Sequence, residues 1–157
     1  MSTVYNILLV IHIVAVAMWL GSNVVMGVGA NRSLGASAEV NIWWAETQGV
    51  LARVIKNAAF ALLFATGIGM IIASDDAIKF SAPFVSFGFL AVIVGGALAG
   101  MVFSPGTRKL AEAHRNGDTA AAKAQADKMG MVGMGESLLV VVTILYMVFK
   151  WGGFGGS

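Results

Sequence analysis

Apolar residues run along this chain in four long blocks, which polar and charged stretches separate. The blocks cover residues 4–29, 57–73, 84–103 and 131–149. Each has about the 17 to 25 residues that a helix needs to cross a hydrocarbon core of roughly 30 Å. The pattern predicts an all-α fold, an integral membrane four-helix bundle that forms a single domain over residues 1–157.

The polar stretch before the second block has a helical periodicity of its own. Residues 38–56 place Trp43, Trp44, Val50 and Val54 among charged and amide side chains, and they contain no proline. This pattern predicts an amphipathic helix that runs into the second block. The two tryptophans would lie at the membrane interface, where tryptophan is favoured.

Two proline positions predict how the third block begins and continues. Ser81 lies shortly before Pro83, so we expect a helix to begin there with the serine hydroxyl as its cap. Helix-forming residues follow Pro105. They predict a kinked continuation of the third helix to about Arg115.

A strong turn signal separates the third block from the fourth. Asn116-Gly117-Asp118 favours a tight turn, and Asp118 can cap a helix that begins at residue 119 and leads into the fourth block. Residues 105–130 would therefore form a helical hairpin outside the membrane. Helices 2, 3 and 4 would all extend beyond the bilayer.

The composition agrees with a membrane protein. Hydrophobic residues make up 58% of the chain and charged residues 11%, with a mean hydropathy of +0.83, whereas roughly a quarter of residues are charged in soluble domains. The chain has no cysteine. This excludes disulfides, thiolate metal ligands, iron–sulfur clusters and covalently attached c-type haem.

Basic residues gather in the connections after the first and third blocks. Only Lys79 and Lys150 lie elsewhere. Because cytoplasmic loops carry an excess of Lys and Arg, we predict that both long connections are cytoplasmic and that both termini lie outside. Topology explains the basic residues, so we expect no nucleic acid partner. The residues in the two connections are Arg32, Arg53, Lys56, Arg108, Lys109, Arg115, Lys123 and Lys128.

Two ionisable side chains interrupt the apolar blocks, His12 in the first and Glu136 in the fourth. Such residues are costly in hydrocarbon, so they usually face the bundle interior, a partner or a cofactor. With a rise of about 1.5 Å per residue, His12 lies roughly 10 Å below the outer boundary and Glu136 roughly 8 Å above the inner one. We therefore predict that the two do not pair directly.

The first block carries a stripe of residues suited to contact a cofactor. His12, Trp19, Asn23 and Met26 recur at helical spacing and share one face, which we expect to look into the bundle. These four are the candidate cofactor-binding residues.

His12 has two interpretations. It could hydrogen-bond a carbonyl or hydroxyl of a neighbouring helix. It could instead be an axial ligand of b-type haem iron, because imidazole is a common haem ligand. No other histidine lies in a block, so the haem iron would be five-coordinate, or its second ligand would be a methionine or come from another chain. The candidate methionines are Met18, Met26 and Met70.

Glu136 also has two interpretations, an interhelical clamp and a proton-transfer group. Its expected partners are Asn23, Arg53, Lys56 and Asn57, which lie at a similar depth. Arg53 is the second candidate for a proton path. No catalytic residue is assigned beyond these two, and enzymatic activity is left open. His114, on the predicted hairpin, reads as a surface histidine.

Three short motifs resemble those of a group of small bacterial membrane proteins. They are His12 followed by Trp19-Leu20-Gly21, Arg53 with Thr66-Gly67, and Gly135-Glu136. The group includes the HemJ-type protoporphyrinogen oxidases, the CopD copper-resistance domain and the uncharacterised DUF2269 proteins. Residues 84–103 have no lysine or histidine, unlike those oxidases, so the resemblance is closest to the DUF2269 type.

The resemblance implies a multi-pass protein of the bacterial inner (cytoplasmic) membrane. It also implies a b-type haem at His12, with Glu136 and Arg53 near a quinone, porphyrin or proton path. A haem-associated redox or haem-metabolism protein is the first functional hypothesis.

The second hypothesis is a non-enzymatic accessory subunit or assembly factor of a larger respiratory or photosynthetic membrane complex. Such a protein, or a homo-oligomer, would pack through its hairpin and through the small-residue face of Gly95, Gly96 and Gly100. A transporter or channel fits least, because the blocks show no internal repeat and no paired charges.

Overall fold

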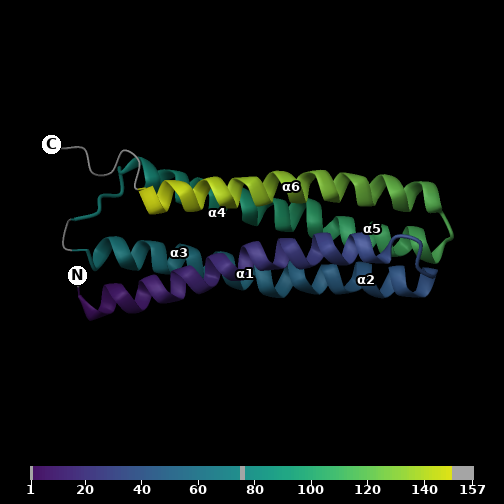
Figure 1. Ribbon diagram of the computed structural model, residues 1–157, viewed down its shortest axis with the longest axis horizontal. Coiled ribbons are helices and arrows are strands. Elements are labelled where there is room, and N and C mark those ends of the chain that lie inside the picture. Colours follow the sequence, from purple (N-terminus) through teal and green to yellow (C-terminus); the bar gives the residue numbers. More distant parts are fainter. Residues whose placement is uncertain (1, 75–76, 150–157) are drawn as a thin grey trace.

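A computed structural model describes residues 2–74 and 77–149, and the described chain folds into four long helical rods (Figure 1). The first rod is α1 (Thr3–Ser33). The second joins α2 (Ala38–Val50), η1 (Leu51–Lys56) and α3 (Asn57–Ile72). The third joins α4 (Pro83–Leu98), η2 (Ala99–Phe103) and α5 (Ser104–Arg115), and the fourth is α6 (Thr119–Phe149). All four are long and apolar enough to cross a membrane, which confirms the predicted all-α, four-helix architecture and suggests a multi-pass membrane protein.

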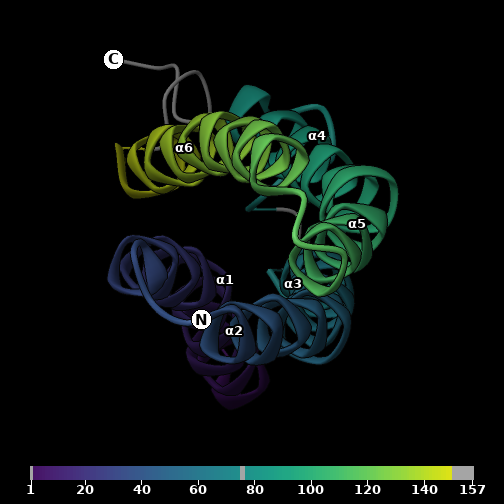
Figure 2. The same ribbon diagram turned by 90° about the vertical axis from the view of Figure 1, so that its right-hand side faces the viewer.

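The rods are arranged in a ring in chain order (Figure 2). At one end α1 packs on α3, α3 on α4, and α4 on α6. At the other end α2 packs on α5 and α5 on α6. The first and last helices also touch, which closes the ring.

The rods are longer than a bilayer requires. They contain 31 to 35 residues each, whereas about 20 residues cross the hydrocarbon core. Exposed charged side chains concentrate on α2, on α5 and on the first turns of α6. We call this end of the bundle the polar half. The opposite end, with α3, α4, the start of α1 and the end of α6, is the apolar half.

The turn between α5 and α6 forms as its sequence predicts. Gly117 has a φ of +69°, a backbone conformation that glycine adopts readily. The Asp118 carboxylate accepts a hydrogen bond from the Ala121 backbone N–H at 2.9 Å, which caps α6.

The predicted start of the third helix needs a correction. α4 begins at Pro83, but its N-cap is Ala82, which has no side-chain hydrogen bond. Ser81 is exposed and lies one residue too early. Proline at the first helical position already fixes φ and removes one unpaired N–H, so the helix begins without a hydroxyl cap. Lys150, which was expected outside the membrane, lies beyond the described residues.

Two rods contain a π-helical segment near their midpoints, η1 and η2, and the two segments contact each other. η2 immediately precedes the helical turn that contains Pro105. Proline has no N–H to donate and its ring crowds the carbonyl four residues earlier, so a wider turn accommodates it. The predicted kink is thus a π-helical segment inside a continuous rod that ends at Arg115.

Glycine allows close helix packing inside this chain. A Cβ built on Gly95 would lie 2.5 Å from the Trp19 ring and 2.8 Å from the Phe60 ring. The two rings are themselves in an edge-to-face contact, with centroids 4.9 Å apart. At Gly100, a Cβ would meet nothing within 4 Å. The small-residue face is therefore used within the monomer at Gly95, and Gly100 stays open.

Candidate functional site

A buried ion pair lies at the centre of the bundle. Lys56 Nζ donates to Glu136 Oε2 at 2.5 Å, and both side chains have no exposed surface. The other carboxylate oxygen, Oε1, accepts a hydrogen bond from Trp19 Nε1 at 2.9 Å. Lys56 Nζ also lies 4.1 Å from the centroid of the Phe103 ring, within the range of a cation–π contact. We call Trp19, Lys56, Phe103 and Glu136 the central cluster.

Each rod supplies one member of the central cluster. Trp19 comes from α1 and Glu136 from α6, so their hydrogen bond joins the first helix to the last. Lys56 ends η1, and Phe103 ends η2. The two π-helical segments therefore deliver the cation and the ring beneath it. π-helical turns shift the register of the side chains that follow, and they are frequent at functional sites.

Lys56 differs most from its predicted role. Its position beside Arg53 and outside the apolar block suggested a cytoplasmic loop cation, but the residue lies within a continuous helical rod and is fully buried. A buried cation needs a paired anion and further polar or aromatic contacts. Glu136 and Phe103 supply both.

Only one of the four expected partners of Glu136 contacts it. Lys56 does, as predicted. Arg53 and Asn57 are exposed. The Asn23 amide nitrogen is buried, and it has no hydrogen-bond partner among the described residues. Sequence reasoning missed Trp19 as a partner, although the residue had been placed on the inward stripe of α1.

His12 is separate from the central cluster, as its depth predicted. Its Nδ1 lies 2.8 Å from Thr66 Oγ1 on α3. The Thr66 hydroxyl donates to the backbone oxygen of Leu62 at 2.5 Å. Because that hydrogen is already used, Thr66 Oγ1 accepts from His12, and Nδ1 carries the imidazole hydrogen. In the neutral ring, Nε2 then has a free lone pair.

The residues of the inward stripe of α1 lie in different environments. His12 is half-buried and contacts α3, whereas Trp19 belongs to the central cluster. Met26 is buried among hydrophobic residues of the polar half. The four candidate residues therefore do not surround one site.

The three candidate methionines lie at different depths. Along α1, Met18 is about 9 Å from His12 and Met26 about 21 Å, at roughly 1.5 Å per residue. Met70 lies one helical turn beyond Thr66, the residue that contacts His12. By the same rise, Met70 lies about 6 Å from the level of Thr66, so it is closer in depth to the imidazole than the other two thioethers.

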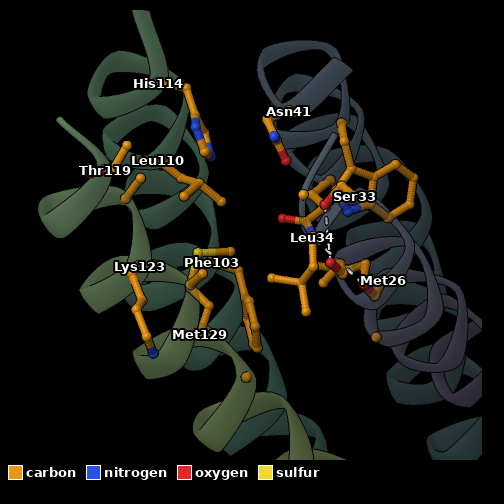
Figure 3. A pocket seen from close by; sticks show the side chains of 18 residues that line it. Met26, Ser33, Leu34, Asn41, Phe103, Leu110, His114, Thr119, Lys123 and Met129 are labelled. Carbon is orange, nitrogen blue, oxygen red and sulfur yellow. Dashed lines mark hydrogen bonds between the residues drawn. The ribbon is translucent and has the colours of Figure 1, made fainter. Parts of the chain in front are cut away.

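The polar half contains a cavity of about 250 Å³. Figure 3 shows it between α1 and α2 on one side and α5 and α6 on the other. His114 lines the cavity from α5 and is half-buried, so it is not the plain surface histidine that was expected. Trp44 lines the opposite wall, whereas Trp43 is 62% exposed. The adjacent tryptophans thus have different environments.

The contacts of the central cluster favour the first interpretation of Glu136, an interhelical clamp, over a proton-transfer group. Both oxygens of Glu136 already bind donors, and those donors come from two other rods. Such a carboxylate holds three helices together in one geometry. A proton-transfer group would instead need a path to water, and Arg53 does not contact Glu136.

Comparisons with protein-family models, with curated proteins and with solved structures found no match. The resemblance to the HemJ, CopD and DUF2269 group therefore stays a prediction from the sequence motifs.

Proposed function

We propose that this protein is a b-type haem-associated redox or haem-metabolism protein of the bacterial inner membrane, with His12 as the axial ligand. The observation that supports the proposal is the hydrogen-bonded state of His12. Its Nδ1–H is held by Thr66, and Thr66 is held by the Leu62 carbonyl. A ligating histidine typically donates its other ring N–H in this way, which fixes the ring and raises the basicity of the free nitrogen.

In this proposal the haem is ligated through one imidazole. His12 Nε2 would hold the iron, and Met70 is the thioether nearest in depth. Gly67 lies beside the imidazole, since a Cβ there would be in ordinary van der Waals contact with His12 Cε1 and with the Phe89 ring, each at 3.9 Å. Bound haem would supply one-electron chemistry. Thr66 would act as a positioning residue that sets the orientation of the imidazole.

Visible absorption of the purified protein tests the proposal. We expect a Soret band in the wild type, its loss in His12→Ala, and its retention in His114→Ala, the matched control at the second histidine. Thr66→Val should shift the band or the haem potential, because it removes the acceptor for Nδ1–H. A colourless wild-type protein, or a band unchanged by His12→Ala, would contradict haem ligation.

One observation favours the second candidate function, an accessory subunit. Several large apolar residues of the polar half are exposed, although this half extends past the length of the hydrocarbon core. Leu34 is 74% exposed, Val50 is 57% exposed and Val40 is 45% exposed. Exposed apolar residues outside a membrane mark interaction sites. Copurification of a partner complex that is lost in Val40→Gln/Val50→Gln, but kept in His12→Ala, would support this function over haem ligation.

A further inference from the structure

The lining of the cavity changes from polar to apolar along the bundle. Polar side chains line it beside the turns that join α1 to α2 and α5 to α6, and apolar side chains line it toward the central cluster. Figure 3 shows His114 and Asn41 facing each other at one end of the cavity, and Met26, Phe103 and Met129 at the other. We call these the polar end and the apolar end. A ligand with a polar head and an apolar body would match both.

His114 is the accessible hydrogen-bonding group of the polar end. It is half-buried, and its imidazole lines the cavity. Its ring nitrogens have no hydrogen-bond partner among the described residues, and they are accessible, unlike the buried Trp44 Nε1 and Gln48 Oε1. A neutral imidazole carries one N–H in either tautomer. His114 can therefore donate a hydrogen bond to the head of a ligand.

The ionisable residues of the lining are both basic. They are His114 and Lys123, and among the described residues no aspartate or glutamate lines the cavity. Lys123 Nζ pairs with Asp127 at 2.6 Å, but both side chains are largely exposed. An exposed ion pair of this kind is weak, so an anionic ligand can replace Asp127 as the partner of the ammonium group. The charge of the lining favours an anionic head over a cationic one.

The shape and size of the cavity restrict the body of the ligand. On α6 the lining extends from Thr119 to Gly130, about 16 Å at roughly 1.5 Å per residue. A cavity of about 250 Å³ that extends this far is narrow, so it suits a single chain. A cavity of roughly 150 Å³ accepts benzene, which has six heavy atoms. By the same proportion, this cavity holds a molecule of about ten heavy atoms, the size of octanoate.

We propose that this cavity binds a medium-chain fatty acid, with its carboxylate at the polar end and its acyl chain directed toward Phe103 and Met129. The carboxylate accepts hydrogen bonds from the His114 imidazole and the Lys123 ammonium group, and the chain covers the apolar end. This site is independent of the proposed haem ligation, since His12 does not line the cavity.

Titration of the untagged protein, ¹³C-labelled at histidine, with sodium octanoate tests the proposal. The chain has two histidines, so the imidazole signal that remains in His12→Ala belongs to His114. We expect this signal to shift saturably. Octylammonium, which has the same chain and a cationic head, should bind about tenfold more weakly because its charge repels that of Lys123. Acetate, which has no chain, should give no saturable shift.

Two variants at the polar end should act in opposite directions. Lys123→Gln removes the cation and should weaken octanoate binding about threefold to fivefold, the effect of losing one exposed ion pair. Asp127→Asn releases the Lys123 ammonium group and should tighten binding by a similar factor. Lys128 is an exposed cation on the same helix that does not line the cavity. Lys128→Gln is therefore the matched control, and it should bind octanoate normally.

A further variant tests the space for the chain without altering the polar end. Gly130 lines the cavity, and a Cβ there would meet nothing within 4 Å. Gly130→Leu should fill the space and abolish the saturable shift. Gly135 is equally open but does not line the cavity, so Gly135→Leu on the same helix should bind normally.

Three results would overturn the proposal. They are the absence of a saturable His114 shift, equal affinities for octanoate and octylammonium, and equal effects of Lys123→Gln and Lys128→Gln. His12→Ala should leave the octanoate affinity unchanged, which separates this site from the outcome of the haem experiment.

Discussion

At the scale of single residues, the ion pair between Lys56 and Glu136 should contribute strongly to fold stability. Removing one member of a buried pair leaves an uncompensated charge, which costs about 3–5 kcal/mol. We expect Lys56→Met to lower the free energy of unfolding by about this amount, measured by titration with a denaturing detergent. Lys123→Met is the control, because the Lys123–Asp127 pair is exposed and should be worth less than about 1 kcal/mol. Equal losses in both variants would contradict the clamp.

The carboxylate can be made neutral without losing its contact with Trp19. In Lys56→Met/Glu136→Gln, the amide oxygen at position 136 can still accept from the Trp19 indole, and no charge remains buried. Replacing both partners of a buried pair is often nearly neutral, whereas breaking it is not. The double variant should therefore be more stable than Lys56→Met alone. Additive losses in a double-mutant cycle would show that the two residues do not act as a pair.

At the residue level, the sequence predicted which side chains lie at similar heights along the bundle. It did not predict which way those side chains point. Counting residues correctly separated His12 from Glu136 and placed Lys56 near the carboxylate. It could not place Trp19, because a long indole reaches beyond the level of its own Cα. Lys56 looked like a loop cation because it lies beside Arg53, and only the tertiary contacts with Glu136 and Phe103 show why a lysine can be buried there.

At the scale of elements, Gly95 and Gly100 give a matched test of helix packing. A methyl group at Gly95 would overlap the Trp19 and Phe60 rings, and overpacking typically costs 1–3 kcal/mol. A methyl group at Gly100 would enter open space. Gly95→Ala should therefore be destabilising by about 1–3 kcal/mol, whereas Gly100→Ala should be neutral or stabilising by up to about 1 kcal/mol. Thermal unfolding in detergent measures both. The reverse order would show that Gly100 makes the closer contact.

The helices themselves were largely predictable. The observed rods are close to those predicted from three features of the sequence. These are the lengths of the apolar blocks, the Asn116-Gly117-Asp118 turn and the amphipathic pattern of residues 38–56. The π-helical turns of η1 and η2 were not predictable, because hydropathy does not record a change of register. These π-helical turns shape the central cluster, since they bring Lys56 and Phe103 together. The cavity between α1 and α2 on one side and α5 and α6 on the other was not predicted either, because it arises from the spacing of the helices.

At the scale of the whole molecule, the distribution of charge predicts which half faces the cytoplasm. Lys56 is buried, so it no longer counts as a loop cation. The other seven cations of the two connections remain, and all seven are exposed: Arg32, Arg53, Arg108, Lys109, Arg115, Lys123 and Lys128. The loop between α3 and α4, at the opposite end, contains Lys79. The positive-inside rule therefore still predicts a cytoplasmic polar half.

Single-cysteine labelling tests this orientation cleanly, because the chain has no cysteine of its own. Asn116 and Ser81 are both exposed and lie in turns at opposite ends of the bundle. In intact cells, a membrane-impermeant maleimide should label Ser81→Cys and should label Asn116→Cys only after permeabilisation. The opposite pattern would place the polar half, with its cavity, on the outer side of the membrane.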